Sequence, residues 1–331
     1  MVARNRVPDE VRAALDMVEQ SDAPPGEKAE MLMEIAMGVQ HKPKRAQDLH
    51  AAADLYARAL EICPAGESLL AARIRARRAT ALMATPASDT ALLEEAKDEL
   101  ETALATLTAE GGDEEVAEAE MNLGLVLQNL AGAGKARIQD AIAAYQRALR
   151  VFDKARHPAE FAILQNNLAT AFLSIPFTDE RAKMREALAV QSFEEGLKVV
   201  NLIDHPREYA MLQNNLGNAL QYASSSHRVE NGFRALEAYD EALKVRNAAD
   251  SPAEYANTIA NKANCLANLP DDPAAPERGN PDNLKKALGL YQEARKIFLG
   301  LGEEEKARLV AEAIEEIRNS LPDPGAAAAM H

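Results

Sequence analysis

The sequence contains no tryptophan, only two cysteines and few aromatic residues, which make up 4% of its 331 positions. A large β-rich core draws heavily on aromatic and β-branched side chains, so this composition disfavours one. Cys63 and Cys265 lie far apart and in no metal-type spacing, which argues against a disulfide framework and a zinc site. Alanine, leucine and glutamate abound, and because these residues suit close-packed helices we expect an all-α protein.

Long apolar runs and an excess of basic residues are also missing. No run long enough to span a membrane occurs, and the N-terminus lacks the apolar core of a signal peptide, so we expect a soluble, cytoplasmic protein. The formal net charge is −15, and residues 89–120 hold twelve acidic residues beside one lysine. Because there is no basic stripe, we expect neither nucleic acid nor a membrane as a partner.

Internal repeats determine the expected architecture. The segment 157–169 returns at 205–217 and more loosely at 251–263, and we call the helices that carry it A helices. A second motif places an aromatic residue three positions before a small residue, and its helices are called B helices. Its tyrosines are Tyr56, Tyr145, Tyr239 and Tyr291. The residue 20 positions after each small residue marks the same place in the next A helix, which we call the anchor position.

This alternation predicts six A/B pairs, at about 27–63, 67–108, 113–153, 157–203, 205–248 and 251–300. A charged capping helix is expected at 303–320 and a disordered tail at 321–331. Each pair buries its apolar face only against its neighbours, so we expect residues 1–320 to form a single right-handed α-solenoid. The run from Ser251 to Glu254 also predicts a capping box at one helix start.

An A helix with Asn215-Leu216-Gly217 at its anchor, followed by a B helix with Ala-x-x-x-Tyr-x-x-Ala-Leu, resembles the tetratricopeptide repeat (TPR). The likeness covers nearly the whole chain, although the period here exceeds the usual 34 or so residues. The long form beginning His-Pro is similar to the repeats of kinesin light chains and of many bacterial arrays. This resemblance implies a helical repeat protein that binds a protein or peptide partner and leaves the pathway open.

Asparagines recur on one face of the predicted A helices. The position before the anchor holds Asn122, Asn167, Asn215 and Asn261, and the same face carries Asn218, Asn257, Asn264 and Asn268. The resemblance to kinesin light chains implies that asparagines before the anchor contact peptide backbone in a concave groove. Each amide offers donors and an acceptor, so such a ladder suits an extended peptide. Alternatively, the asparagines solvate a polar groove or bond between neighbouring A helices.

Two arginines extend this prediction into the second repeat. With Ala79 at the anchor, Arg78 is in register with the ladder and Arg77 precedes it. Their guanidinium groups suit bidentate pairing with an acidic side chain or a C-terminal carboxylate. The alternative is an intramolecular partner among the acidic residues 89–120.

Catalytic and metal-binding patterns are lacking. The six histidines are isolated, lie at helix starts or fall in the tail, and no nucleophile with a partner base is evident. We therefore predict a non-catalytic protein-interaction module that needs no cofactor or metal. The alternative is a structural self-assembling subunit or a regulatory adaptor that uses its convex or terminal surfaces, and a homo-oligomer is compatible with either.

Overall fold

The computed structural model describes residues 9–43, 45–175, 180–224 and 227–321. Across these ranges the chain forms α-helices and one short 3₁₀ helix, and no strand is present. Six helix pairs are followed by a capping helix, so the predicted all-α solenoid fold is confirmed. The predicted tail lies, apart from Leu321, outside the described residues.

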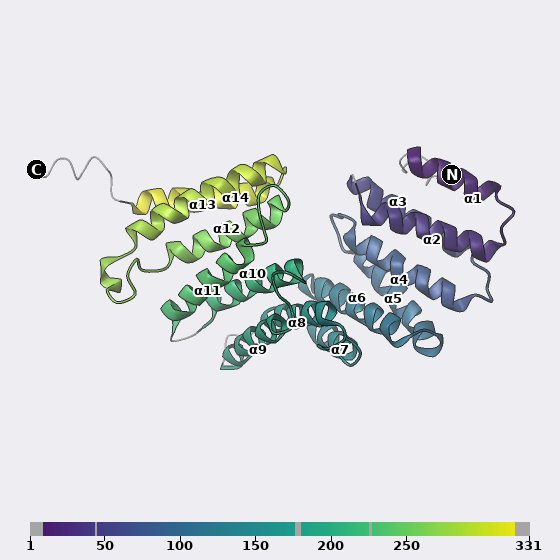
Figure 1. Ribbon diagram of the computed structural model, residues 1–331, viewed down its shortest axis with the longest axis horizontal. Helices are drawn as coiled ribbons and strands as arrows, with labels where there is room; N and C mark the ends of the chain where they lie inside the picture. Colours follow the sequence, from purple (N-terminus) through teal and green to yellow (C-terminus); the bar gives the residue numbers. More distant parts are fainter. Residues whose placement is uncertain (1–8, 44, 176–179, 225–226, 322–331) are drawn as a thin grey trace, which may run out of the picture. The chain divides into compact units, whose positions relative to one another are not determined.

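The chain divides into two compact units, residues 1–153 and 154–331. Figure 1 labels their helices in chain order. The first unit contains α1 (Asp9–Gln20) and the pairs α2 (Pro25–His41)/α3 (Ala46–Ile62), α4 (Ser68–Ala84)/α5 (Ala91–Glu110) and α6 (Asp113–Gly132)/α7 (Ile138–Ala148). The second contains α8 (Pro158–Leu173)/α9 (Glu180–Leu197), α10 (Pro206–Tyr222)/α11 (Arg228–Leu243), α12 (Pro252–Ala267)/α13 (Pro281–Gly300), η2 (Pro276–Arg278) and α14 (Glu304–Ser320). Consecutive helices pack against each other within each unit. A single array over residues 1–320 stays a prediction.

In five of the six helix pairs the B helix buries an aromatic residue, and in α5 the buried Leu100 takes that position. Tyr239 is fully buried, and its ring occupies the space beside Gly217, where a Cβ atom would lie 2.6 Å from the ring. Its hydroxyl donates to Oε1 of Gln221 on the same A helix, 2.8 Å away. Tyr145 has the same relation to Gly124 and Gln128 in the other unit. The repeated tyrosine therefore serves the core of the pair.

The turns from B to A helices in the second unit are built on asparagine. Asn201 Oδ1 accepts the backbone N–H groups of Ile203 and Asp204, both at 2.9 Å. Asn247 makes the equivalent bonds before α12. Such side-chain turns fix the loop, which explains its constant length. The predicted capping box is wrong, because Ser251 makes no side-chain cap bond and its hydroxyl lies 3.4 Å from the Asn247 carbonyl oxygen.

Burial in α4 corrects the predicted register of the second repeat. The buried residues Ala72, Ile74, Ala79, Ala81 and Leu82 have the spacing of Ala210, Leu212, Gly217, Ala219 and Leu220 in α10. Arg78 therefore holds the anchor position of α4, and Arg77 takes the ladder position. The predicted anchor, Ala79, is wrong by one residue because the connection from α3 is one residue shorter than the repeat elsewhere. An apolar alanine had matched the leucine of other repeats better than arginine does.

Candidate binding site on the A helices

Five asparagines form one hydrogen-bonded series in the second unit, and we call it the asparagine chain. It consists of Asn261, Asn214, Asn215, Asn166 and Asn167, in donor order. Each Nδ2 donates to the Oδ1 of the next, at 3.3, 3.0, 2.8 and 3.2 Å respectively. Two of these bonds cross between helices, one from α12 to α10 and one from α10 to α8. The chain therefore ties three successive A helices together.

Asn215 and Asn261, which belong to the predicted ladder, thus hydrogen-bond to neighbouring A helices. This agrees with the alternative interpretation, in which the asparagines bond between helices. Those partners, Asn166 and Asn214, are buried and were not singled out from the sequence. The signal that would have found them is the Asn-Asn dipeptide, which places one amide toward each neighbouring A helix. Asn167 accepts one bond through Oδ1, and its Nδ2 has no protein partner within the described ranges. Hydrogen-bond donors and acceptors that bind no described residue therefore remain on Asn167, at the end of the asparagine chain.

The other predicted asparagines of this unit are placed differently. Asn218 Oδ1 lies 2.7 Å from the Tyr239 hydroxyl and shares its single proton with Gln221 Oε1, so Asn218 faces the B helix. Asn264 Nδ2 donates to the Tyr222 hydroxyl at 2.5 Å, and Asn268 Nδ2 donates to the backbone and side-chain oxygens of Asn264. Asn257 is half-buried and makes no side-chain hydrogen bond in the described part of the chain. Tyr222 itself is 67% exposed and was missed by the sequence analysis.

A cavity between α4 and α6 brings Asn122 and Arg77 together in the first unit. Its lining also includes Arg73, Ala76, Thr80, Leu107, Glu115, Glu118 and Ala119. In the corrected register Ala76 is equivalent to Asn214, the residue that accepts the bond from the next ladder asparagine. Alanine has no amide to offer, and Asn122 has no side-chain partner among the described residues. The hydrogen-bonding groups of its amide are therefore not used by the described part of the chain.

The charges around this cavity are mixed. Arg73 holds Glu115 in a bidentate pair, with N···O distances of 2.6 and 3.1 Å. That pair lowers the pKa of Glu115, with a further contribution from the Gly112 N–H. Arg77 is exposed and forms no ion pair with a described residue, and Glu118 also lines the cavity without one. The cavity thus offers one guanidinium and one carboxylate that are not held by ion pairs.

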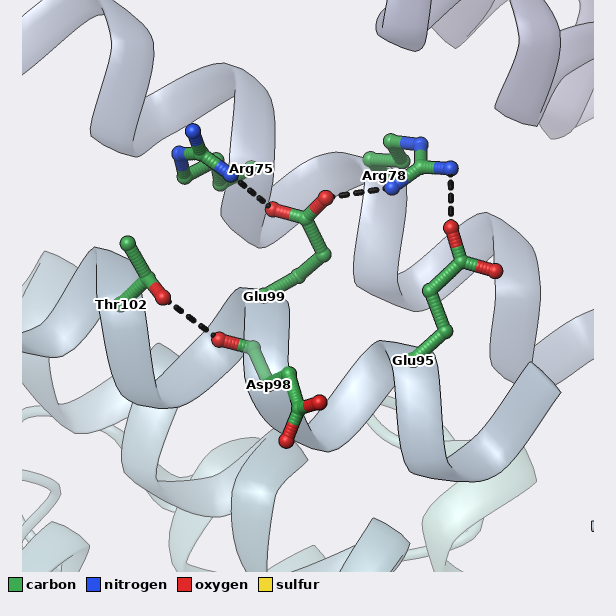
Figure 2. Close-up of polar contacts among 6 residues, drawn as sticks. All are labelled: Arg75, Arg78, Glu95, Asp98, Glu99 and Thr102. Carbon is green, nitrogen blue, oxygen red and sulfur yellow. Dashed lines mark hydrogen bonds and ion pairs between the residues drawn. The ribbon is translucent and has the colours of Figure 1, made fainter. Parts of the chain in front are cut away.

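Arg78 points elsewhere and is neutralised by α5. One Nη atom binds Glu99 and the other binds Glu95, while Arg75 Nη1 donates to the second oxygen of Glu99 at 2.7 Å (Figure 2). The Glu99 side chain is only 10% exposed, so this network belongs to the helix interface. Arg78 therefore pairs with acidic residues of its own chain, as the alternative interpretation expected. Of the two predicted arginines, Arg77 is the one that lines a cavity.

Reactive groups are scarce in the described residues. Burial raises the pKa of the Cys265 thiol to about 12, and burial followed by the charge of Glu67 raises that of Cys63. Both thiols therefore stay protonated and unreactive at neutral pH. Across the described ranges no cluster of three or more His, Cys, Asp or Glu residues has metal-binding geometry. No helix in those ranges combines the length and apolar character of a membrane span.

Comparison with solved structures identifies the fold. The chain is similar to BtubC (BKLC) from P. vanneervenii, with a TM-score of 0.50 and 20% identity over 74% of this chain and 91% of that one. It is also similar to a signal transduction ATPase with a tetratricopeptide repeat sensor from Pyrococcus horikoshii. That match has a TM-score of 0.57 and 15% identity, and covers 91% of this chain but 42% of the ATPase. No family model and no curated protein matches the sequence. The fold is that of TPR-type helical repeat proteins.

Proposed function

We propose that this chain is a non-catalytic protein-interaction module whose A helices bind an extended segment of a partner protein. One observation carries the proposal: Arg77 and Asn122 line the same cavity. Both side chains have hydrogen-bonding capacity that no described residue uses. An amide that offers donors and an acceptor suits peptide N–H and C=O groups, and the guanidinium suits a carbonyl or carboxylate oxygen.

The asparagine chain supports the same function in a second way. The ladder members Asn167, Asn215 and Asn261 are half-buried, and each uses at most one N–H and one acceptor site within the asparagine chain, so each retains further hydrogen-bonding capacity. Asn167 keeps both N–H groups of Nδ2. The repeat portion of the Pyrococcus horikoshii ATPase is described as a sensor, and a recognition role here would be of the same general kind. A few backbone bonds of about 1 kcal/mol each are compatible with an affinity near micromolar.

Short random peptides displayed on phage test the proposal, with the full chain as bait. Selected peptides are synthesised and titrated against the wild type and against Arg77→Ala and Asn122→Ala. Each substitution should weaken binding about ten-fold, the loss of one to two hydrogen bonds. The matched control is Gln139→Ala, which removes an exposed amide from the B helix α7. Failure to select any peptide, or equal binding by all variants, contradicts the proposal.

Self-association is a second candidate, favoured by exposed leucines near the C-terminus of the described chain. Leu299, Leu301 and Leu309 are 50%, 44% and 52% exposed on the end of α13, the following turn and α14. Several exposed apolar side chains close together in the sequence are typical of a surface that another subunit covers. Light scattering over a wide concentration range tests this function. A monomer at every concentration rules it out.

A further inference from the structure

A groove in the second unit is lined by α11, α12 and α13, and we call it the α11–α13 groove. Its volume is about 500 Å³, which is within the range of small-molecule sites. The residues that line it are Leu236, Asp240, Lys262, Leu266, Lys286, Gly289 and Leu290. Leu236 and Leu290 pack against the core cluster that contains the buried Leu266. Core packing therefore fixes the apolar surface of the groove.

Two departures from the repeat shape this groove. Lys262 holds the anchor position of α12, where α6, α8 and α10 have the buried leucines Leu123, Leu168 and Leu216. Gly289 lies five positions before Ala294, the small residue of α13, and no atom lies within 4 Å of the place that its Cβ would take. The other B helices carry a side chain at that position: Asp54, Asp98, Ala143, Gln191 and Glu237. The groove thus depends on two residues that the equivalent positions of the other repeats do not hold.

The charges that line the groove favour an anion. The Lys262 ammonium group pairs with the Asp240 carboxylate, so these two charges neutralise each other. Lys286 is exposed and forms no ion pair with a described residue. Because an ammonium group donates hydrogen bonds and accepts none, its ligand has to supply an acceptor, and a negative charge on that acceptor adds attraction.

An apolar surface beside one unpaired ammonium group matches a molecule that combines a hydrocarbon part with an acid group. We propose that the α11–α13 groove binds a small carboxylic acid with an apolar tail. The tail covers Leu236, Leu266 and Leu290, and the carboxylate pairs with Lys286. Because Arg77 and Asn122 line a different cavity, this proposal and the proposed function can fail independently.

Three probes that share one hydrocarbon part test the proposal, each titrated against the full chain by ligand-observed NMR. They are phenylbutyrate, phenylbutanol and phenylbutylamine, which are anionic, neutral and cationic at neutral pH. The anion should bind about five-fold more tightly than the alcohol, a typical effect of one exposed ion pair. The cation should bind most weakly, because Lys286 repels it.

Paired variants locate the binding site. Lys286→Gln should abolish the preference for the anion, whereas Lys285→Gln should keep it, because Lys285 already pairs with Asp282 at 3.0 Å. Gly289→Met should fill the groove and weaken the binding of all three probes about ten-fold. Its control is Gly38→Met in α2, another glycine with no atom within 4 Å of its Cβ position, and this variant should bind as the wild type does.

Circular dichroism checks that each variant is folded before it is titrated. The proposal is overturned if none of the three probes binds the wild type, or if the anion binds no more tightly than the alcohol. Undiminished binding by Gly289→Met overturns it as well, because the probes then bind elsewhere on the chain.

Discussion

Asn215 of α10 donates a 2.8 Å hydrogen bond from Nδ2 to Oδ1 of Asn166 on α8. Asn166 is buried, and its Nδ2 donates in turn to Oδ1 of Asn167, the last residue of the asparagine chain. An asparagine in the predicted ladder is therefore a structural contact between repeats as well as a candidate ligand contact. Substitutions in the asparagine chain must be assayed for folding before they are assayed for binding.

Removing the central acceptor should destabilise the second unit. Asn166→Ala leaves the Asn215 donor and the Asn167 acceptor without their partners, so the free energy of unfolding should fall by about 1–3 kcal/mol. Urea denaturation followed by circular dichroism measures the change. Asn129→Ala, whose amide bonds only its own helix, is the control and should change stability by less than about 0.5 kcal/mol. Equal stability of both variants would show that the bonds between helices contribute nothing.

Two glycines should respond to alanine in opposite directions. In Gly217→Ala the new Cβ would lie 2.6 Å from the buried ring of Tyr239, so overpacking should cost about 1–3 kcal/mol. Gly289 lies within α13 and has no atom within 4 Å of the equivalent position. Gly289→Ala should therefore stabilise the protein by up to about 1 kcal/mol through helix propensity. Thermal or urea denaturation compares the two, and the same sign for both refutes the argument.

Replacing the contact between the half-buried Arg246 and the buried Thr258 by apolar residues should raise stability. Arg246 donates to Oγ1 of the fully buried Thr258 at 2.8 Å, and burial lowers the pKa of its guanidinium. The equivalent positions in the preceding repeat hold Val200 and Leu212, which are both buried. Arg246→Leu combined with Thr258→Leu should increase the free energy of unfolding by about 1–4 kcal/mol.

The single substitution Thr258→Leu provides the contrast for that variant. It leaves the half-buried Arg246 guanidinium without its hydroxyl partner, so stability should fall below that of the wild type. Differential scanning calorimetry measures all three proteins. A double variant less stable than the wild type contradicts the account of this junction.

Alkaline pH should unfold the protein through its buried acids. Burial raises the pKa of Tyr56, Tyr291 and Cys265 to about 12, and raises those of Tyr145 and Tyr239 as well. The unfolded chain ionises first, near the ordinary tyrosine pKa of about 10. The stabilisation is therefore complete below that pH and is lost as the pH rises toward 12. The urea midpoint should fall across this range as the pH rises, while tyrosinate absorbance increases, and a constant midpoint would refute this.

The helix pairs were predictable because the repeat encodes them twice, in apolar spacing and in turn residues. The capping helix predicted at residues 303–320 corresponds to α14. The register of α4 was not predictable, because sequence matching assigns an apolar residue to the anchor, whereas Arg78 occupies it through a network with Glu95 and Glu99. A buried charge can replace a leucine only when its partners lie on the facing helix, and their positions depend on packing.

The candidate site was predictable in composition but not in bonding. Sequence spacing placed the asparagines on the A helices, yet an amide that bridges two helices and an amide that is free are the same residue type. The difference lies in the neighbour: Asn214 accepts the bond from Asn261, whereas Ala76 has nothing to offer Asn122. Once the helices are aligned by burial, this difference can be read from pairs of residues in successive repeats.

The asparagine turns before α10 and α12 set limits on how the chain can be altered. Asn201 and Asn247 bind the backbone within three residues of themselves, so an extra residue there would break the turn and displace the following A helix. The connection from α12 to α13, by contrast, is long and includes a 3₁₀ turn. Length variation should therefore accumulate in A-to-B connections. A fluorescent protein or epitope inserted for cellular work belongs in the segment between α12 and α13.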